Sequence, residues 1–380
     1  MADQRSAGWD ERVAARLAGI REAGRWRQPR TLDAFDAVTG RIDDGDGAPL
    51  VSFASNDYLG LSHHPAVVAA AHEALDRWGA GTGAARLIVG SRPVHDELEA
   101  ALAAWKGSDD AVLFPTGFAA NLGVLATLGT AGVTVLSDEL NHASIIDGCR
   151  LARADVQVYR HADLDHLAKL LADVPGPALV ATDTVFSMDG DAVDLPALAE
   201  LTAGHGALLV LDEAHAVLGP DLPAGDLVTS DAPVLRVGTL SKTLGSLGGF
   251  VAAPQPYADL LRNVARPFIF TTASTPADMA AALAAVHVVT SPEGDELRAR
   301  LRRHVDRLRP GHPSPIVPVV LGDEATAVAA ARRLEDQGLL VPAIRPPTVP
   351  PGTCRLRVAL SAAHTDDQVD RLVEALGSLG

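Results

Sequence analysis

Lys242 is the residue of this sequence with the clearest chemical potential, because it follows an apolar run of strand length and precedes a glycine-rich segment. The chain has 29 arginines but only three lysines. Lys106 precedes a glycine at the end of an amphipathic run, which is typical of a helix C-terminal cation, and Lys169 lies in a short polar-faced helix pattern. The alternative for Lys242 is a surface lysine that happens to precede glycines.

Two apolar runs are expected to position the reactive groups. The run 208–211 is followed by Asp212 and His215, and the run 234–237 is followed by Thr239 and Lys242. Short, nearly continuous apolar runs are typical of parallel strands covered on both faces. Ligands of such sheets bind outside the carboxyl ends of the strands. The sequence therefore predicts that a carboxylate, an imidazole and an amine share one ligand.

An amine and a carboxylate placed in this way suit one cofactor chemistry in particular. A lysine can hold an aldehyde cofactor as a Schiff base, and pyridoxal phosphate (PLP) then needs an acid beside its pyridine nitrogen to keep the ring an electron sink. Asp212 suits that role, and His215 could reach the phenolic oxygen of the cofactor.

Three other hypotheses explain less of the chain. Asp-Glu-Ala-His (212–215) spells a helicase-type box, but no Walker lysine precedes it and the chain is acidic. A metal hydrolase built on His142, Asp212 and His215 leaves Lys242 unexplained. A catalytically silent scaffold with a PLP fold is disfavoured by the intact Asp212, His215 and Lys242.

The motifs Asp-Glu-Ala-His (212–215) and Thr-Leu-Ser-Lys (239–242) resemble those of the fold-type I PLP enzymes, specifically the α-oxoamine synthases. The resemblance runs from about residue 9 to the C-terminus. It implies a homodimer and a catalytic set made of Lys242, Asp212 and His142, the last stacking on the pyridine ring. It also implies a cofactor-binding set that consists of Gly117, Phe118, His142, Ser187, Asp212, His215, Thr239, Lys242, Thr271 and Thr272. The two threonines would reach the cofactor phosphate of the partner subunit.

A stiff segment, Ile-Arg-Pro-Pro-Thr-Val-Pro (344–350), resembles the branch of the family that makes 8-amino-7-oxononanoate for biotin synthesis. That branch condenses L-alanine with a pimeloyl thioester of coenzyme A or an acyl carrier protein, and releases CO2 and the free carrier. The implied substrate contacts are Arg27, Asn56, Arg345, Thr348 and Arg357, of which Arg357 would grip the amino acid carboxylate. The alternative within the family is another α-oxoamine synthase, such as glycine C-acetyltransferase. The glycine cluster Gly81–Arg86 departs from the usual family pattern.

Composition excludes several classes of protein. A net charge of −16 argues against nucleic-acid binding. Two cysteines provide no disulfide framework, and no Cys/His cluster suggests a zinc or other metal site. No apolar run approaches the roughly 18 residues of a membrane span, and the charged N-terminus lacks a signal-peptide pattern. We expect a cytoplasmic enzyme without nucleic-acid or membrane partners.

From residue 111 onward, strand and helix patterns alternate, which predicts an α/β fold. Together with the resemblance, this implies a fold-type I PLP-dependent transferase with a large, mostly parallel-sheet domain and a smaller α+β domain. We expect an N-terminal helix and arm over 1–50, the large PLP-binding domain over 51–280 and the small domain over 281–380. Residues 277–309 are expected to be helical, and residues 339–344 are expected to form a strand.

Overall fold

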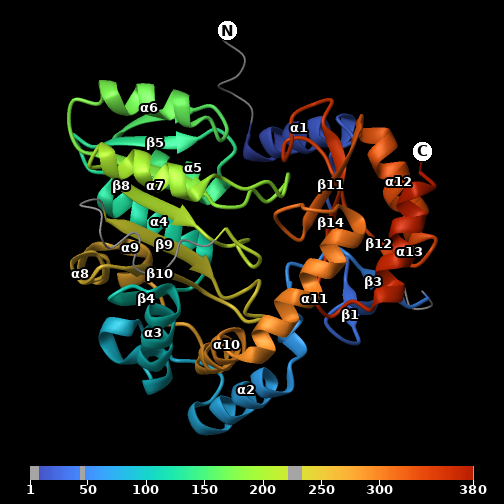
Figure 1. Cartoon of the computed structure of the whole chain (residues 1–380), viewed down its shortest axis with the longest axis horizontal. Helices are drawn as coiled ribbons and strands as arrows, with labels where there is room; N and C mark the ends of the chain where they lie inside the picture. The colour runs from blue at the N-terminus through green and yellow to red at the C-terminus, as the bar shows by residue number, and fades with distance from the viewer. Residues whose placement is uncertain (1–7, 43–47, 221–232, 380) are drawn as a thin grey trace.

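The computed structural model describes residues 8–42, 48–220 and 233–379. Figure 1 shows the large sheet and its helices in the left half of the view. A smaller lobe around β11 (Ile316–Gly322) and β14 (Cys354–Ala359) lies in the right half. No helix of the described ranges is both long and apolar enough to cross a membrane. The predicted combination of a mostly parallel sheet with a smaller α+β unit is confirmed.

The large sheet has seven strands in the order β4-β10-β9-β8-β7-β5-β6. The strands from β9 to β6 in this order are parallel, whereas β10 runs antiparallel to both of its neighbours, β9 and β4. Their bounds are Asp110–Phe114 for β4, Thr134–Asp138 for β5, Asp155–Tyr159 for β6, Ala178–Asp183 for β7, Leu208–Asp212 for β8, Val234–Thr239 for β9 and Gly249–Ala253 for β10. Because the parallel strands end at one edge, Asp183 of β7 lies in register with Asp212 of β8.

Helices cover both faces of this sheet, which explains why its central strands are apolar at nearly every position. In β8, Val210 packs into one core while Leu209 and Leu211 pack into the other. The first core is shared with α4, α5, α8 and α9, and the second with α6 and α7. The helices are α4 (Gly117–Leu128), α5 (Ala143–Leu151), α6 (Leu164–Asp173), α7 (Leu195–Gly204), α8 (Gln255–Val264) and α9 (Arg266–Ile269).

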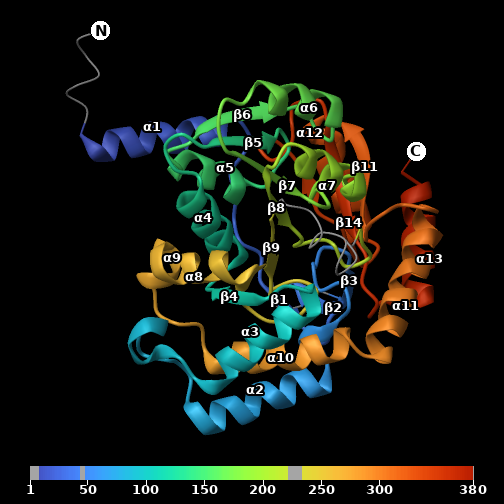
Figure 2. The same ribbon diagram turned by 60° about the vertical axis from the view of Figure 1, so that its left-hand side comes forward.

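A third and larger core joins the sheet to the rest of the chain. Its helices α2 (Pro65–Trp78), α3 (Pro93–Lys106) and α10 (Pro276–Val289) pack together, as Figures 1 and 2 both show. The smaller lobe adds α11 (Pro292–Leu308), α12 (Glu324–Glu335) and α13 (Asp366–Gly377) around the sheet β11-β14-β13. The N-terminal helix α1 (Trp9–Glu22) buries none of its residues.

The N-terminal strands pair with the C-terminal part of the chain. Strands β1 (Leu32–Ala34), β2 (Thr39–Ile42) and β3 (Leu50–Ser52) form an antiparallel sheet, and β12 (Leu339–Leu340) adds to β3 in parallel. Residues 43–47, which follow β2 in the chain, lie outside the described ranges. The proposed division of the chain into three parts stays a prediction.

One local prediction was confirmed and one was wrong. The stretch 277–309 is helical, in two helices, because α10 ends at Val289 and α11 begins at Pro292, whose ring suits the first turn of a new helix. The stretch 339–344 is not one strand: β12 pairs with β3, whereas β13 (Ala343–Ile344) pairs with β14. Pro342 separates the two and has no N–H to donate to a ladder.

Strand β6 was not predicted at all. It is an edge strand whose first four residues are exposed, so its sequence lacks the continuous apolar run of the central strands. The loop that follows β6 nevertheless contacts the ends of two other segments of the large domain. His161, just beyond β6, lies between Asp138 at the end of β5 and Asp191 in the loop after β7, with Nδ1 3.1 Å and Nε2 2.7 Å from their carboxylates. The hydrogen bonds with Asp138 and Asp191 raise the pKa of His161 to about 10.

This ion triad predicts a pH-dependent contribution to stability. The pKa of His161 is higher in the folded chain, about 10, than the ordinary value of 6.5, so the charged ring favours folding below pH 6.5. That contribution is lost as the pH rises from 6.5 through about 10. We expect H161Q to lower the free energy of unfolding by about 1.5–3 kcal/mol at roughly pH 6, and by much less at roughly pH 10.

Urea denaturation of both proteins across this pH range provides the measurement. H205Q, at an exposed histidine that ends α7, is the control and should differ from the unaltered protein by a constant amount. A deficit of H161Q that does not change with pH would contradict a charged His161.

Candidate active site

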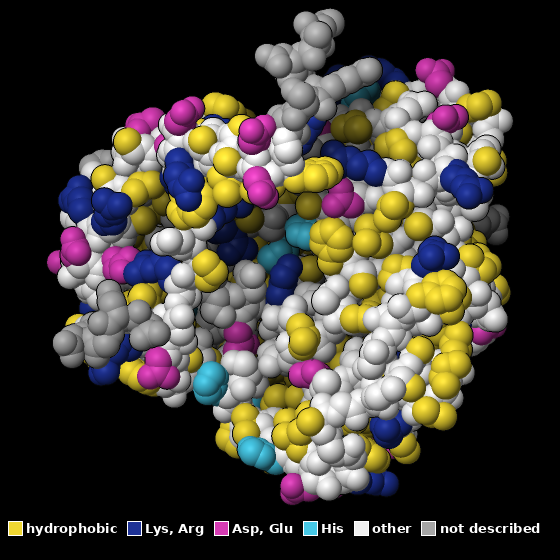
Figure 3. Space-filling model, turned by 180° about the vertical axis from the view of Figure 1, so that it is seen from behind, with side chains coloured by type: hydrophobic (Ala, Val, Ile, Leu, Met, Phe, Trp, Pro, Cys, Tyr) yellow, Lys and Arg dark blue, Asp and Glu magenta, His cyan; other side chains and the backbone are white. Residues whose placement is uncertain are grey.

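Lys242 lies in the loop between β9 and β10, and its amine points to His215. The distance from Lys242 Nζ to His215 Nε2 is 2.8 Å. Burial lowers the pKa of Lys242, and the positive charge of Arg357 lowers it further, against the opposing charges of Asp212 and Asp183. At neutral pH, a larger fraction of the Lys242 amine is therefore uncharged than for a lysine in water. Figure 3 shows a face that is hollowed near its centre, with basic and histidine side chains in the hollow.

A continuous chain of hydrogen bonds runs from Lys242 to the smaller lobe. Tyr58 Oη lies 2.6 Å from His215 Nδ1, and it donates to Asn56 Oδ1 at 3.1 Å. Arg357 Nη2 donates to the same Asn56 oxygen, also at 3.1 Å. Since the Tyr58 proton goes to Asn56, His215 Nδ1–H donates to Tyr58, and His215 Nε2 accepts from Lys242. Burial keeps the pKa of His215 well below its ordinary value, so this ring is neutral.

Arg357 is the contribution of β14 to the site. Only 5% of its surface is exposed, and Nε donates to the backbone oxygen of Ser187 at 2.5 Å. These two hydrogen bonds fix the plane of the guanidinium but use only Nε–H and one Nη2–H. The remaining hydrogens can serve a carboxylate ligand. Ser187 is thus at the site, although the contact described here is made by its carbonyl oxygen.

Asp212 ends β8 and is held by two donors. The backbone N–H of Ala214 donates to Oδ1 at 2.9 Å, and Asn121 Nδ2 donates to Oδ2 at 2.6 Å. A second buried acid, Asp183, lies in register on β7. Burial and the charge of Asp212 raise the pKa of Asp183 well above its ordinary value. Burial therefore disfavours the charged form of Asp183 beside Asp212.

His142 is the N-cap residue of helix α5, and contacts with Asp183 and Ser144 fix its position. Its backbone N–H donates to Asp183 Oδ2 at 2.7 Å, and its Nδ1 lies 2.7 Å from Ser144 Oγ. The Phe118 ring meets the His142 ring edge to face, with centroids 6.3 Å apart. Burial of the inner side of the ring lowers the pKa of His142.

The start of α4 forms a cradle of backbone N–H groups. Thr116 caps the helix by accepting from the N–H of Ala119 at 3.0 Å. A Cβ on Gly117 would come within 3.2 Å of the Thr239 side chain, and one on Gly249 within 2.4 Å of the Thr116 backbone. Only glycine therefore leaves room at position 249, and a side chain at position 117 would press on Thr239. Unsatisfied N–H groups and the helix dipole make such a place suitable for phosphate.

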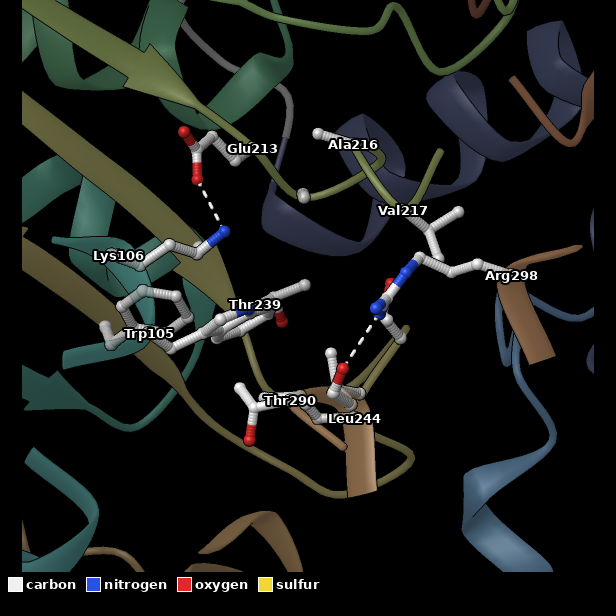
Figure 4. A pocket seen from close by; sticks show the side chains of 14 residues that line it. Trp105, Lys106, Glu213, Ala216, Val217, Thr239, Leu244, Thr290 and Arg298 are labelled. Atoms are coloured by element: carbon white, nitrogen blue, oxygen red, sulfur yellow. Dashed lines mark hydrogen bonds and ion pairs between the residues drawn. The ribbon is translucent and has the colours of Figure 1, made fainter. Parts of the chain in front are cut away.

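Lys106, the second lysine near β8, lines a cavity and pairs with Glu213. Lys106 Nζ lies 2.8 Å from Glu213 Oε2, and Arg236 Nε donates to Glu213 Oε1 at 2.6 Å. Burial alone would raise the pKa of Glu213, but the charges of Lys106 and Arg236 outweigh it and lower that pKa. Figure 4 shows the Lys106–Glu213 pair and Arg298 on the walls of this cavity, which also includes Thr239. Lys106 is thus a structural cation at the end of α3, as its position in the sequence indicated.

The other predicted residues lie apart from this network. Arg345 donates to the backbone oxygen of Gly24 at 3.3 Å and lies 3.9 Å from Glu324, which places it beside the N-terminal arm that carries Arg27. Thr348 is exposed, in a turn closed by its N–H to the oxygen of Arg345. Thr271 and Thr272 line a small cavity next to Phe114 and Pro115, at the end of β4.

Four residues at the site were not singled out from the sequence: Tyr58, Asn121, Ser144 and Asp183. Tyr58 lies two residues after Asn56, and Ser144 lies two residues after His142, so both are close in sequence to predicted site residues. Asn121 is a buried polar residue in an apolar helix, which is the pattern that could have identified it.

The assembled groups suit PLP. Lys242 has a lowered pKa and provides an amine, and Asp212, fixed by two donors, provides a partner for a pyridine nitrogen. The exposed ring of His142 is available for stacking, and the start of α4 provides a place for phosphate. Arg357 adds a guanidinium for a carboxylate.

Comparison with known proteins agrees with this chemistry. The model of the aminotransferase class I and II family matches residues 48–376. An 8-amino-7-oxononanoate synthase from Methylobacterium sp. (strain 4-46) is 48% identical over 379 residues, which cover 98% of this chain and 97% of the relative. A second one, from Halorhodospira halophila, is 47% identical over 391 residues and covers 98% of this chain and 96% of the relative.

Solved structures give the same result for the fold. A serine palmitoyltransferase from S. paucimobilis with bound PLP and myriocin superimposes with a TM-score of 0.89 at 31% identity, covering 97% of each chain. The chain therefore belongs to the aminotransferase class I and II family and, within it, to the 8-amino-7-oxononanoate synthases, which are PLP-dependent acyltransferases of fold type I.

Proposed function

We propose that this enzyme condenses L-alanine with a pimeloyl thioester, giving 8-amino-7-oxononanoate, CO2 and the free carrier in biotin synthesis. The observation that carries the proposal is the hydrogen-bond chain that joins Lys242, through His215, Tyr58 and Asn56, to Arg357. It connects an amine suited to proton transfer with a guanidinium suited to an amino acid carboxylate. The two substrates, held together, react as in an intramolecular condensation.

Lys242 is proposed to hold the cofactor and then to remove the α-proton of alanine. Burial and the charge of Arg357 lower its pKa, which makes the amine a better acceptor of a proton near neutral pH. His215 accepts a hydrogen bond from the amine and so orients its lone pair. PLP, when bound, supplies the electron sink for the electrons that the departing proton leaves behind.

Asp212 and His142 are proposed to orient the pyridine ring of the cofactor. Asp212 remains an acceptor because Ala214 and Asn121 both donate to it, which suits a partner for a protonated pyridine nitrogen. His142 would stack on the ring, with Phe118 against its other side. The proposed phosphate contacts are the N–H groups at Gly117 and Phe118 and the Thr239 hydroxyl, while Ser187 and His215 would contact the phenolic oxygen.

The substrates are proposed to bind on the side of the smaller lobe. Arg357 and Asn56 would take the alanine carboxylate, because the guanidinium keeps donors to spare after bonding Asn56 and Ser187. Arg345 and Thr348 on the stiff proline segment, with Arg27 on the arm, would take the far end of the acyl chain or its carrier. The contact of Arg345 with Gly24 supports this grouping, because it holds the arm against the proline segment.

The choice of substrates is tested by comparing kcat/KM for pimeloyl and acetyl thioesters, each with alanine and with glycine. A charged contact to the far end of the acyl chain is worth about 1.5–3 kcal/mol, so pimeloyl should be preferred by about 10- to 150-fold. R345A should remove most of that preference while leaving the rate with the acetyl thioester nearly unchanged. A preference for acetyl with glycine would instead identify a glycine C-acetyltransferase. Running the pimeloyl assay with both coenzyme A and acyl carrier protein identifies the donor.

The cofactor lysine can be tested directly. K242A should lose both turnover and the pyridoxyl label that borohydride fixes on the protein, because no other amine lies beside His215 in the described site. K169A, at an exposed lysine, is the matched control and should keep both. Peptide mapping that finds the label on Lys106 or Lys169 would overturn the assignment.

We also propose that the enzyme acts as a homodimer in the cytoplasm, with Thr271 and Thr272 reaching the phosphate of the partner subunit's cofactor. Apolar side chains exposed near these threonines support a covered surface. Leu87, Ile88 and Val89 are 55%, 74% and 71% exposed and Phe270 is 70% exposed, and their segments lie in contact. Monomers rarely leave such side chains clustered in water.

The dimer is tested by placing a charge in this cluster. I88D should shift the protein toward monomer in sedimentation analysis and reduce activity in parallel, because the phosphate would lose its contacts from across the interface. V320D, at a valine that is 58% exposed on β11, is the matched control and should leave the oligomeric state unchanged. A fully active monomer would refute both the interface and the role of the two threonines.

A further inference from the structure

Asn121 lies between the two groups that are proposed to handle the cofactor ring. Its amide nitrogen donates to Asp212 Oδ2 at 2.6 Å and to Ser144 Oγ at 2.9 Å. Ser144 Oγ in turn lies 2.7 Å from His142 Nδ1. The side chain is 1% exposed, and its amide oxygen is buried with no hydrogen-bond partner in the described part of the chain. Both hydrogens of the amide are therefore used, and the oxygen is not.

Asp212, Asn121, Ser144 and His142 form a row of hydrogen-bonded side chains. The direction of each hydrogen bond in this row follows from the charge state of Asp212. An ionised Asp212 can only accept, so the amide of Asn121 must present its nitrogen. The second amide hydrogen then goes to Ser144 Oγ, whose own hydrogen is left for His142 Nδ1. The backbone N–H of Ser144 also points to this nitrogen, at 3.2 Å. Nδ1 consequently has no room for a proton, and the neutral ring carries its hydrogen on Nε2.

We propose that Asn121 is a positioning residue that couples the charge of Asp212 to the tautomer of His142, so that an ionised Asp212 fixes the Nε2–H form of the histidine beside the cofactor ring. This inference rests on the proposed roles of Asp212 and His142. The unpartnered amide oxygen supports it, because packing alone would also be served by the flipped amide. The flipped amide would place its oxygen against a carboxylate and is excluded by repulsion.

Other charged and titratable groups lie near this row and influence the protonation of its members. Asp183 from β7 and Lys242 from the loop after β9 interact electrostatically with Asp212, and His215 interacts with His142. Arg357 acts on Lys242 and His215. Burial lowers the pKa of His142, which keeps its ring neutral where the row requires a neutral ring. None of these groups changes when Asn121 is replaced, so a comparison of variants isolates the amide.

The test compares N121D with N121A in the holoenzyme. N121D keeps the shape of the side chain but puts an acceptor where two donors are needed, next to the charge of Asp212. N121A leaves a small cavity and removes the hydrogen bonds without adding charge. If Asn121 only filled space, the isosteric N121D would be the milder change. Coupling through hydrogen bonds predicts the reverse order.

We expect the apparent dissociation constant of PLP to rise about 10-fold in N121A and about 100-fold in N121D at neutral pH. In N121D it should recover as the pH falls, because the new carboxyl group becomes a donor when protonated. Selective ¹⁵N labelling of histidine should show the Nε2–H tautomer for His142 in the unaltered protein and a mixture of tautomers in N121A. S144A should disturb the tautomer but leave the PLP affinity nearly unchanged.

T127A, at a buried threonine further along α4, is the control for loss of a polar side chain from this helix and should change neither measurement. A milder effect of N121D than of N121A, or an unaltered His142 tautomer in N121A, would overturn the proposal. These outcomes do not depend on which acyl substrate is used. A wrong substrate assignment would leave them intact, whereas the loss of label in K242A independently tests that PLP is bound at this site.

Discussion

The site depends on a balance of charges that are kept out of water at one edge of a sheet. Lys242, Arg357, Asp212 and Asp183 all lie within mutual influence, and each shifts or opposes the protonation of another. A buried charge without a partner is costly, so these groups are stable only as a set. Hydrogen bonds from His215, Tyr58 and Asn56 connect the set across two lobes. The relative position of the lobes and the chemistry of the amine are therefore determined by the same contacts.

The end of β8 shows how a strand serves two purposes with two neighbouring acids. Successive residues of an extended chain point to opposite sides. Asp212 faces Asn121, whereas the next residue, Glu213, faces Lys106 and Arg236 on the other side. The first pairing leaves the carboxylate available to a ligand, and the second neutralises the carboxylate completely. Lys242, proposed to be the reactive lysine, and Lys106, which pairs with Glu213, thus both lie close to the same strand.

Much of this could be predicted from the sequence because the reactive residues follow strands whose apolar runs are unmistakable. The spacing of Asp212, His215 and Lys242 was sufficient to place them together. Asn121 and Tyr58 could not be found in this way, since they approach their partners from remote parts of the chain and only folding brings them there. Strand β6 was missed because its exposed position removes the apolar pattern. The break at Pro342 was missed because two short apolar segments look like one strand until their partners are known.

The pairing of β3 with β12 has a consequence for how the protein is made. Val51 leaves the ribosome well before its partner Leu339, because most of the described chain lies between the two residues. The strands β1 to β3 must therefore wait beside a growing chain, with one edge of their small sheet unsatisfied, while the large sheet forms between them and their partner. Unpaired strand edges attract other chains. Nascent chains that stall before Leu339 thus present an open edge that the finished enzyme has closed.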